Sequence, residues 1–81
     1  MTIPVAFYSY FKDLTGAACV EVDLPPETPL GRLHDRLIEL HPRLGEMRKS
    51  TLIAVGVEYQ DSSYVLQQGD EVAFFPPVQG G

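Results

Sequence analysis

A single helix-forming segment lies between strand-forming segments, and it limits the folds open to this chain more than any other feature. Its leucines recur every three or four residues, so they fall on one helix face, opposite a charged face. Thr28 is a favourable N-cap before Pro29 at the first helical position, and Pro42 ends the helix near His41. The predicted apolar stripe consists of Leu30, Leu33, Leu37, Ile38, Leu40 and Leu44.

The segments on either side of this helix alternate between apolar and other residues, which is the period of a strand. Strands are predicted at residues 3–8, 19–24 and 52–57, with a short strand at 58–60 and a last strand from Val72 to Phe75. The first two are close enough in sequence to form an antiparallel hairpin. A helical turn at residues 11–15 is predicted to end at Gly16, and Gly56-Val57 suits a type II′ turn.

This order of elements predicts an α+β domain in which a mixed sheet packs on one main helix. A chain of 81 residues is expected to build one hydrophobic core. We therefore assign residues 1–75 to one domain and residues 76–81 to an extended C-terminal tail. Residues 42–50 form a charged connector after the helix, with room for one more helical turn.

The tail begins where the last strand can no longer continue. Pro76 and Pro77 lack the amide hydrogen that a sheet ladder needs, and they hold the backbone extended. The segment from Pro76 to Gly81 can therefore reach about 20 Å. Gly80 and Gly81 have no Cβ, so they could thread a narrow channel and carry a terminal carboxylate into another protein's active site. The alternative interpretation is an ordinary frayed end of small residues.

Composition excludes several classes of function. The net charge is −5, which argues against a nucleic acid partner because phosphates require a basic surface. The sequence has no long apolar run and no signal peptide, and its one cysteine, Cys19, has no internal partner, so we expect a cytoplasmic protein outside the membrane. Every lysine and arginine lies between Lys12 and Lys49, which leaves the C-terminal part acidic. That asymmetry fits either ordinary solubility or a basic partner surface.

The side chains offer little chemistry of their own. Cys19 shares a strand face with acidic residues, which make a thiol less reactive. His34 and His41 lie about 10.5 Å apart along the helix axis, too far to share one zinc ion, so no metal site is predicted. His41 is better placed to interact with the helix dipole. Neither a catalytic triad nor a glycine-rich phosphate loop is present, so no bound cofactor is expected.

The stretch Gly69-Asp70-Glu71-Val72-Ala73-Phe74-Phe75-Pro76-Pro77-Val78-Gln79-Gly80-Gly81 resembles the C-terminus of the MoaD family, the ubiquitin-like sulfur carriers that form the small subunit of molybdopterin synthase. The stretch from Tyr8 to Gly16 also resembles the family, with Lys12 and Asp13 where Arg and Glu are more usual. Gly56-Val57 replaces the family's common Asn-Gly, a change in turn chemistry alone.

This resemblance implies the β-grasp, or ubiquitin-like, fold with adjacent, parallel first and last strands. It implies that an adenylating enzyme of the ubiquitin-activating type, MoeB-like, uses ATP to activate Gly81. A thiocarboxylate then replaces the acyl-adenylate, and its sulfur passes to cyclic pyranopterin monophosphate in the large, MoaE-like subunit. In this scheme the chain belongs to a hetero-oligomer and has no active site of its own. Gly80 and Gly81 thread into the partner.

Phe75, Pro76, Pro77 and Val78 are the residues that we expect to dock on the partner. Phe75 points away from the predicted core, and an exposed aromatic side chain before a stiff segment suits an interface. The alternative is that neighbours in its own sheet cover Phe75. Other functions compatible with a Gly-Gly end are sulfur transfer for thiamine or thionucleoside synthesis, a protein modifier conjugated through Gly81, and a passive binding module.

Overall fold

The computed structural model describes residues 1–77, and residues 78–81 lie outside the described part. Five strands and three helical segments follow one another in the predicted order. Their bounds are β1 Thr2–Phe7, α1 Tyr10–Thr15, β2 Cys19–Asp23, α2 Leu30–Leu40, η1 Pro42–Ser50, β3 Leu52–Val55, β4 Glu58–Tyr59 and β5 Val72–Phe75. The segment η1 covers the charged connector with two short 3₁₀ stretches separated by a kink at Met47, where φ is −118° and ψ is 18°, so it is longer than the single turn predicted there.

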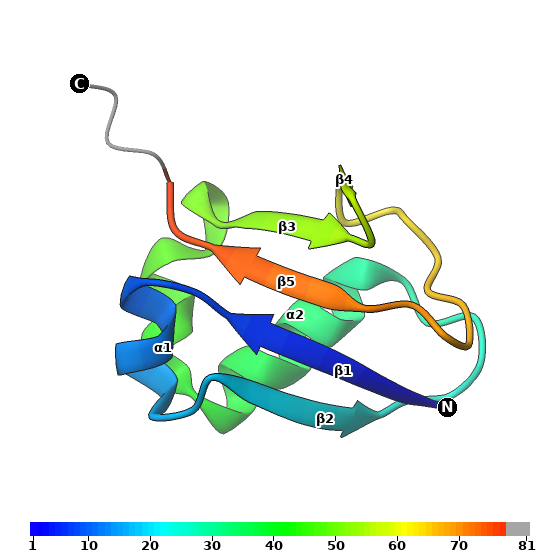
Figure 1. Cartoon of the computed structure of the whole chain (residues 1–81), viewed down its shortest axis with the longest axis horizontal. Coiled ribbons are helices and arrows are strands. Elements are labelled where there is room, and N and C mark those ends of the chain that lie inside the picture. The colour runs from blue at the N-terminus through cyan, green and yellow to red at the C-terminus, as the bar shows by residue number, and fades with distance from the viewer. Residues whose placement is uncertain (78–81) are drawn as a thin grey trace.

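The strands form one mixed sheet in the order β2-β1-β5-β3-β4 (Figure 1). The central pair, β1 and β5, is parallel, and every other pair is antiparallel. This confirms the α+β class, the β1–β2 hairpin, and the adjacent, parallel first and last strands of the β-grasp. Parallel pairing with β5 starts at Val5, so Pro4, which lacks a donor, lies just before it.

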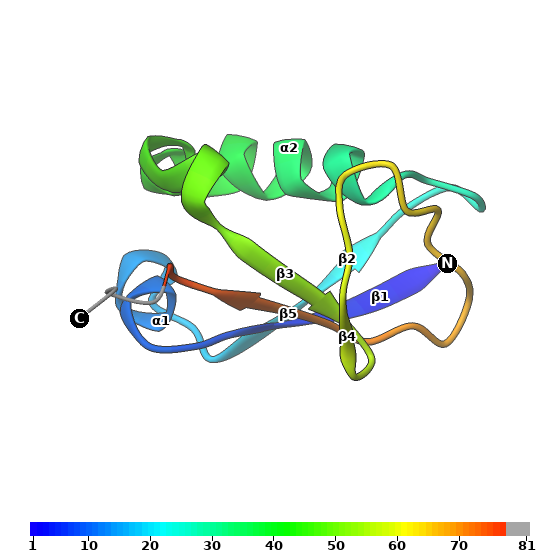
Figure 2. The same ribbon diagram turned by 90° about the horizontal axis from the view of Figure 1, so that it is seen from above.

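The core lies between the sheet and α2. Figure 2 shows α2 and η1 on one face of the sheet, while none of the described helices covers the opposite face. Strand residues of one parity point toward α2 and are buried, as predicted for Ile3, Val5, Phe7, Val72 and Phe74. From the helical segments, Phe11, Leu30, Leu33, Leu37 and Leu44 complete this core. Each such side chain contributes about 1.5–3 kcal/mol by leaving water.

Leu40 is an exception to the predicted stripe, because 52% of its surface is exposed. The helix ends at this residue, and the chain turns at His41 into η1. Leu44 then packs into the core from η1, with an exposed fraction of only 1%. The change of direction at Pro42 therefore places Leu44 in the core and leaves Leu40 at the surface.

The N-cap prediction was wrong by one residue. Pro29 occupies the N-cap position, and the Thr28 hydroxyl donates to the Pro25 carbonyl instead, at 2.6 Å. The first free amides of the helix bond to another part of the chain: Leu30 N–H donates to the Tyr64 carbonyl and Gly31 N–H to the Ser62 carbonyl. A neighbouring backbone thus satisfies the donors that a capping side chain would have bonded.

Two turns match their predicted chemistry. Gly16 ends α1 in the left-handed conformation, with φ 73° and ψ 13°. Gly56 has a positive φ of 65°, whereas the φ of Val57 is not positive. This combination fits the type II′ turn. The strand predicted to reach residue 57 therefore stops at Val55, where β3 turns into β4.

The predicted boundary between a domain of residues 1–75 and a tail of residues 76–81 stays a prediction, because most of that tail lies outside the described residues. The last strand does end at Phe75. None of the helices in residues 1–77 has both the length and the apolar character that spanning a bilayer would require.

Candidate functional site

The last strand delivers its two phenylalanines to opposite faces of the sheet. Phe74 points into the core and is fully buried, whereas Phe75 lies on the face away from α2 and is half-buried. Pro76 and Pro77 follow directly and are also half-buried. Three of the predicted site residues, Val78, Gly80 and Gly81, lie outside the described part of the chain.

Phe75 lies between two tyrosines. Tyr8 directly follows β1, and Tyr59 belongs to β4. The Tyr8 ring stacks on Phe75, with ring centroids 4.8 Å apart and planes 8° from parallel. The Tyr59 ring meets Phe75 edge to face at 6.2 Å. Tyr8 is 49% exposed and Tyr59 is 65% exposed, so these three rings form a surface that we call the aromatic patch. Sheet neighbours therefore support Phe75 without removing this patch from solvent.

A row of alanines lies beside the aromatic patch on the same face. Cross-strand pairing joins Ala6 to Ala73, Ala73 to Ala54, and Ala54 to Tyr59. These methyl side chains leave the sheet surface flat. A flat apolar floor with an adjacent ring cluster is the type of surface that a partner protein can cover.

Acidic residues lie on this face or on the edge strand β4 beside it, and the basic residues lie elsewhere. The exposed carboxylates of Glu21, Asp23, Glu58 and Glu71 belong to the sheet and its connections, and we call them the acidic rim. All lysines and arginines belong to α1, α2 and η1, namely Lys12, Arg32, Arg36, Arg43, Arg48 and Lys49. The charge asymmetry of the sequence thus becomes a difference between the sheet layer and the helical layer.

His34 lies on the buried side of the last strand. Its ring meets Phe74 edge to face at 5.1 Å, and its Nε2 is buried without a hydrogen-bond partner. Burial lowers the His34 pKa to about 4, and repulsion from Arg48 adds to this effect while Asp35 opposes it. The imidazole is therefore neutral near pH 7 and acts as part of the core under the aromatic patch.

The other candidates for chemistry remain isolated. Cys19 is exposed on β2, and His41 packs edge to face on Phe7 at 6.3 Å, away from His34. Among residues 1–77, no group of three or more His, Cys, Asp or Glu side chains could hold a metal ion. The described residues thus combine an exposed aromatic patch with an absence of clustered metal-ligating side chains.

Phe75, Pro76 and Pro77 were predicted as docking residues, and this stays a prediction. Tyr8 and Tyr59, which lie against Phe75, were not predicted from the sequence. Tyr8 shares the outward parity of Pro4 and Ala6, so placing the first strand parallel to the last would have set it beside Phe75. Tyr59 could not be placed in this way, because its position depends on the register of the short strand β4.

Comparison with known proteins gives a consistent result. The ThiS family matches residues 5–81. The human protein named molybdopterin synthase sulfur carrier subunit is 32% identical over 82 aligned residues, covering 98% of this chain and 93% of the relative. The Mycobacterium tuberculosis protein of the same name is 41% identical over 61 residues, covering 75% of this chain and 74% of that relative.

Solved structures of similar proteins share the fold. A putative molybdopterin converting factor subunit 1 from Pyrococcus furiosus has a TM-score of 0.87 at 26% identity, covering 96% of this chain and 99% of that one. SAMP1 from Haloferax volcanii has a TM-score of 0.85 at 24% identity, covering both chains fully. A chain from the Helicobacter pylori complex of molybdopterin-converting factor subunits 1 and 2 has a TM-score of 0.72 at 23% identity, again with full coverage of both chains.

Proposed function

This chain belongs to the ThiS family, and from that premise we propose that it is the sulfur carrier subunit of a molybdopterin synthase. The relatives with this name match it over nearly its whole length. The observation that carries the proposal is the aromatic patch at the place where β5 leads into the Gly-Gly tail. A carrier needs such a surface, because its tail must be held on a partner while the chemistry takes place.

The reacting group in this proposal is the C-terminal carboxylate of Gly81. A carboxylate is a poor electrophile, so a partner enzyme first transfers AMP from ATP to it and releases pyrophosphate. The outer sulfur of a persulfide then displaces AMP and forms an acyl disulfide. A second thiol cleaves the S–S bond, which leaves a thiocarboxylate at Gly81 and a disulfide on the sulfur donor. This sulfur passes to cyclic pyranopterin monophosphate. ATP is bound and used by the activating partner, and the carrier supplies the group that is carried.

The partners proposed are the large, MoaE-like subunit and an adenylating, MoeB-like enzyme, in the cytoplasm. A complex of subunits 1 and 2 is known for the Helicobacter pylori protein, which supports a hetero-oligomer here. The aromatic patch and the alanine row would form the apolar centre of the interface, and the acidic rim would meet basic side chains at its edge. Pro76 and Pro77 would direct the tail away from the sheet and into the partner.

The test is reconstitution with an activating enzyme, ATP and a sulfur source, using the wild-type chain and Gly81→Ala. We expect the wild-type mass to rise by the exchange of one oxygen for sulfur, and molybdopterin to form when the large subunit and the precursor are added. Gly81→Ala should lose most of this transfer and keep its circular dichroism spectrum, because the added methyl lies in the threaded segment. Full transfer by this variant would refute the proposal.

Two alternatives keep the same fold. A protein modifier would form covalent conjugates through Gly81, and the likeness to SAMP1 supports only the shared fold at this level of identity. A carrier for thiamine or thionucleoside synthesis would form the thiocarboxylate but give its sulfur to another acceptor. Covalent ladders that survive reductant would indicate the first alternative, and thiocarboxylate without molybdopterin formation would indicate the second.

A further inference from the structure

A different surface of the molecule, the free edge of β2, has unused backbone groups. Within residues 1–77, β2 pairs with β1 on one side and has no strand on the other. Leu24 N–H donates to the Met1 carbonyl, and Phe7 N–H donates to the Ala18 carbonyl. Hydrogen-bonded pairs alternate along antiparallel strands, so the even-numbered residues of β2 bond to β1. The odd-numbered residues of β2 therefore turn their N–H and C=O groups toward the free edge. These residues are Cys19, Glu21 and Asp23.

The side chains of β2 divide the same edge into two chemically different faces. Glu21 and Asp23 are exposed on the face away from α2, and they lie in the acidic rim. Val20 and Val22 point toward α2, and Val22 is buried. The strand contains no proline, lysine or bulge of the kind that blocks pairing at an edge.

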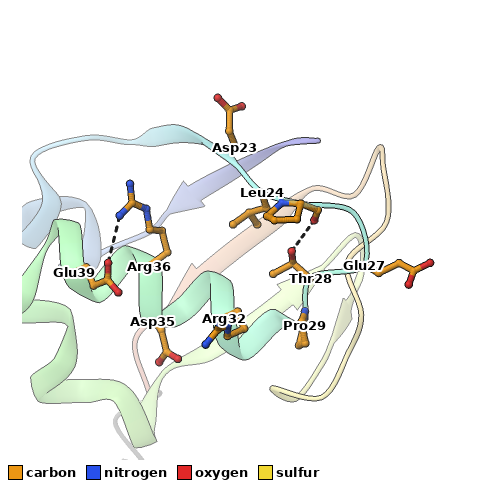
Figure 3. A pocket seen from close by; sticks show the side chains of 10 residues that line it. Asp23, Leu24, Glu27, Thr28, Pro29, Arg32, Asp35, Arg36 and Glu39 are labelled. Carbon is orange, nitrogen blue, oxygen red and sulfur yellow. Dashed lines mark hydrogen bonds and ion pairs between the residues drawn. The ribbon is translucent and has the colours of Figure 1, made fainter.

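A groove continues this edge toward the helix. It has a volume of about 510 Å³ and lies between the end of β2, the following loop and α2. Figure 3 shows Leu24 and Pro29 on the loop side and Arg36 paired with Glu39 on the helix side, while Asp23 points away from the helix. The exposed Leu40 lies one helical turn beyond Arg36 and extends this surface with an apolar side chain.

We propose that the β2 edge and this groove bind an extended segment of a partner protein in which basic and apolar residues alternate. The segment adds to β2 as an antiparallel strand and bonds to the outward backbone groups. Its basic side chains lie opposite Glu21 and Asp23, and its apolar side chains lie toward α2. There they cover Val20 and the aliphatic parts of Arg32 and Arg36.

Charge excludes a second copy of this chain as the favoured occupant. If two β2 strands paired antiparallel about Glu21, the two Glu21 carboxylates would lie directly opposite each other. Like charges at such positions destabilise the pair. A segment of opposite charge removes this repulsion and gains attraction in its place, so the edge selects a basic partner strand.

The first experiment uses a capped synthetic peptide of alternating lysine and valine, titrated into the ¹⁵N-labelled protein. We expect shifts along β2 and the facing side of α2. The peptide should slow amide exchange at Cys19, Glu21 and Asp23 relative to the free protein, and should change it little at Val20 and Val22, whose amides already bond to β1. A matched peptide of alternating glutamate and valine should bind at least tenfold more weakly. Shifts confined to Tyr8, Tyr59 and Phe75, or equal binding of both peptides, would overturn the proposal.

Variants at one position separate the backbone contribution from the charge. Glu21→Pro removes an outward N–H without removing a bond to β1, so it should keep the fold and lower peptide affinity at least tenfold. Glu21→Gln keeps the backbone and should lower affinity about two- to fivefold. If Glu21→Pro does not fold, the proposal is tested by whether the peptide slows amide exchange at the outward residues of β2 in the wild type. Concentration-dependent shifts at β2 without peptide would indicate self-pairing and contradict the proposed occupant.

Discussion

At the scale of single residues, His34 has the most consequential environment. It is an ionisable side chain in a position that the helix pattern assigns to the interior, and its exposed fraction is only 6%. Phe74 lies against its ring, and its Nε2 has no partner within the described structure. The neutral ring is tolerated as a polar core residue, but a proton on it has no acceptor and meets the positive charge of Arg48.

This environment predicts a pH dependence of stability. The His34 pKa is about 4 in the folded protein and about 6.5 in the unfolded chain, so the unfolded state binds the proton first. The stability that neutral His34 allows is fully present above pH 6.5 and is lost as the pH falls toward 4. The loss is about 3 kcal/mol and can be measured by urea unfolding across this range.

The matched control is His34→Phe, which keeps an aromatic ring and cannot titrate. Its stability should equal or exceed that of the wild type at pH 7, because no hydrogen bond to Nε2 is lost. The advantage of the variant should grow as the pH falls below 6.5, while carboxylate titration affects both proteins alike. A constant difference between the two proteins over this range would show that His34 does not control the effect.

At the scale of elements, the start of α2 and the segment from Ser62 to Leu66 stabilise each other. The Ser62 and Tyr64 carbonyls accept from the first helical amides, and Leu66 N–H donates to the Thr28 carbonyl. Gly31 allows this approach, because a Cβ added there would lie 3.0 Å from the Ser62 Cβ. The helix start is therefore built from two segments that are distant in sequence.

Replacing Gly31 with alanine should consequently destabilise the protein, although alanine is the better helix former. We expect a loss of about 1–2 kcal/mol in the free energy of unfolding, from crowding against Ser62. Ser62→Gly removes the nearest atom. Gly31→Ala should therefore cost less stability when it is introduced into the Ser62→Gly variant than when it is introduced into the wild type. Additive effects of the two changes in thermal unfolding would contradict this packing.

The secondary structure could be predicted from the sequence where local pattern decides it. Period-two alternation identified β1, β2 and β5, and Gly16 identified the end of α1, because these signals act within a few residues. The cap of α2 could not be found in this way, since its partners at Ser62 and Tyr64 belong to another segment. Leu40 was misassigned because the chain turns after it, which periodicity does not detect.

At the scale of the whole molecule, the basic residues are confined to the helical layer, whereas acidic residues occur in both layers. The acidic rim lies on the sheet, and the basic residues lie on the helices. The sequence already indicated an acidic C-terminal part, and the fold adds Glu21 and Asp23 to the same side. The outward direction of Phe75 was likewise predictable, whereas the full aromatic patch required the sheet order that brings Tyr8 and Tyr59 beside it.

Association with the proposed large subunit should therefore depend on salt mainly through its rate. We expect the association rate constant of the wild type to fall steeply as ionic strength rises. The double variant Glu58→Gln, Glu71→Gln should associate more slowly, and its rate constant should depend less on salt. Stopped-flow fluorescence would measure both. Phe75→Ala, which keeps all charges, should chiefly raise the dissociation rate. A salt-independent association rate in the wild type would remove the acidic rim from the interface.

The central position of β5 also has a consequence for synthesis. This strand lies between β1 and β3, so the sheet stays divided until residues 72–75 have left the ribosome. Contacts between the first and last strands are the most distant in sequence, and they form late for that reason. A chain interrupted before β5 has neither a closed core nor a tail to display. An activating enzyme that requires the assembled sheet would thus receive only chains whose translation has passed that strand.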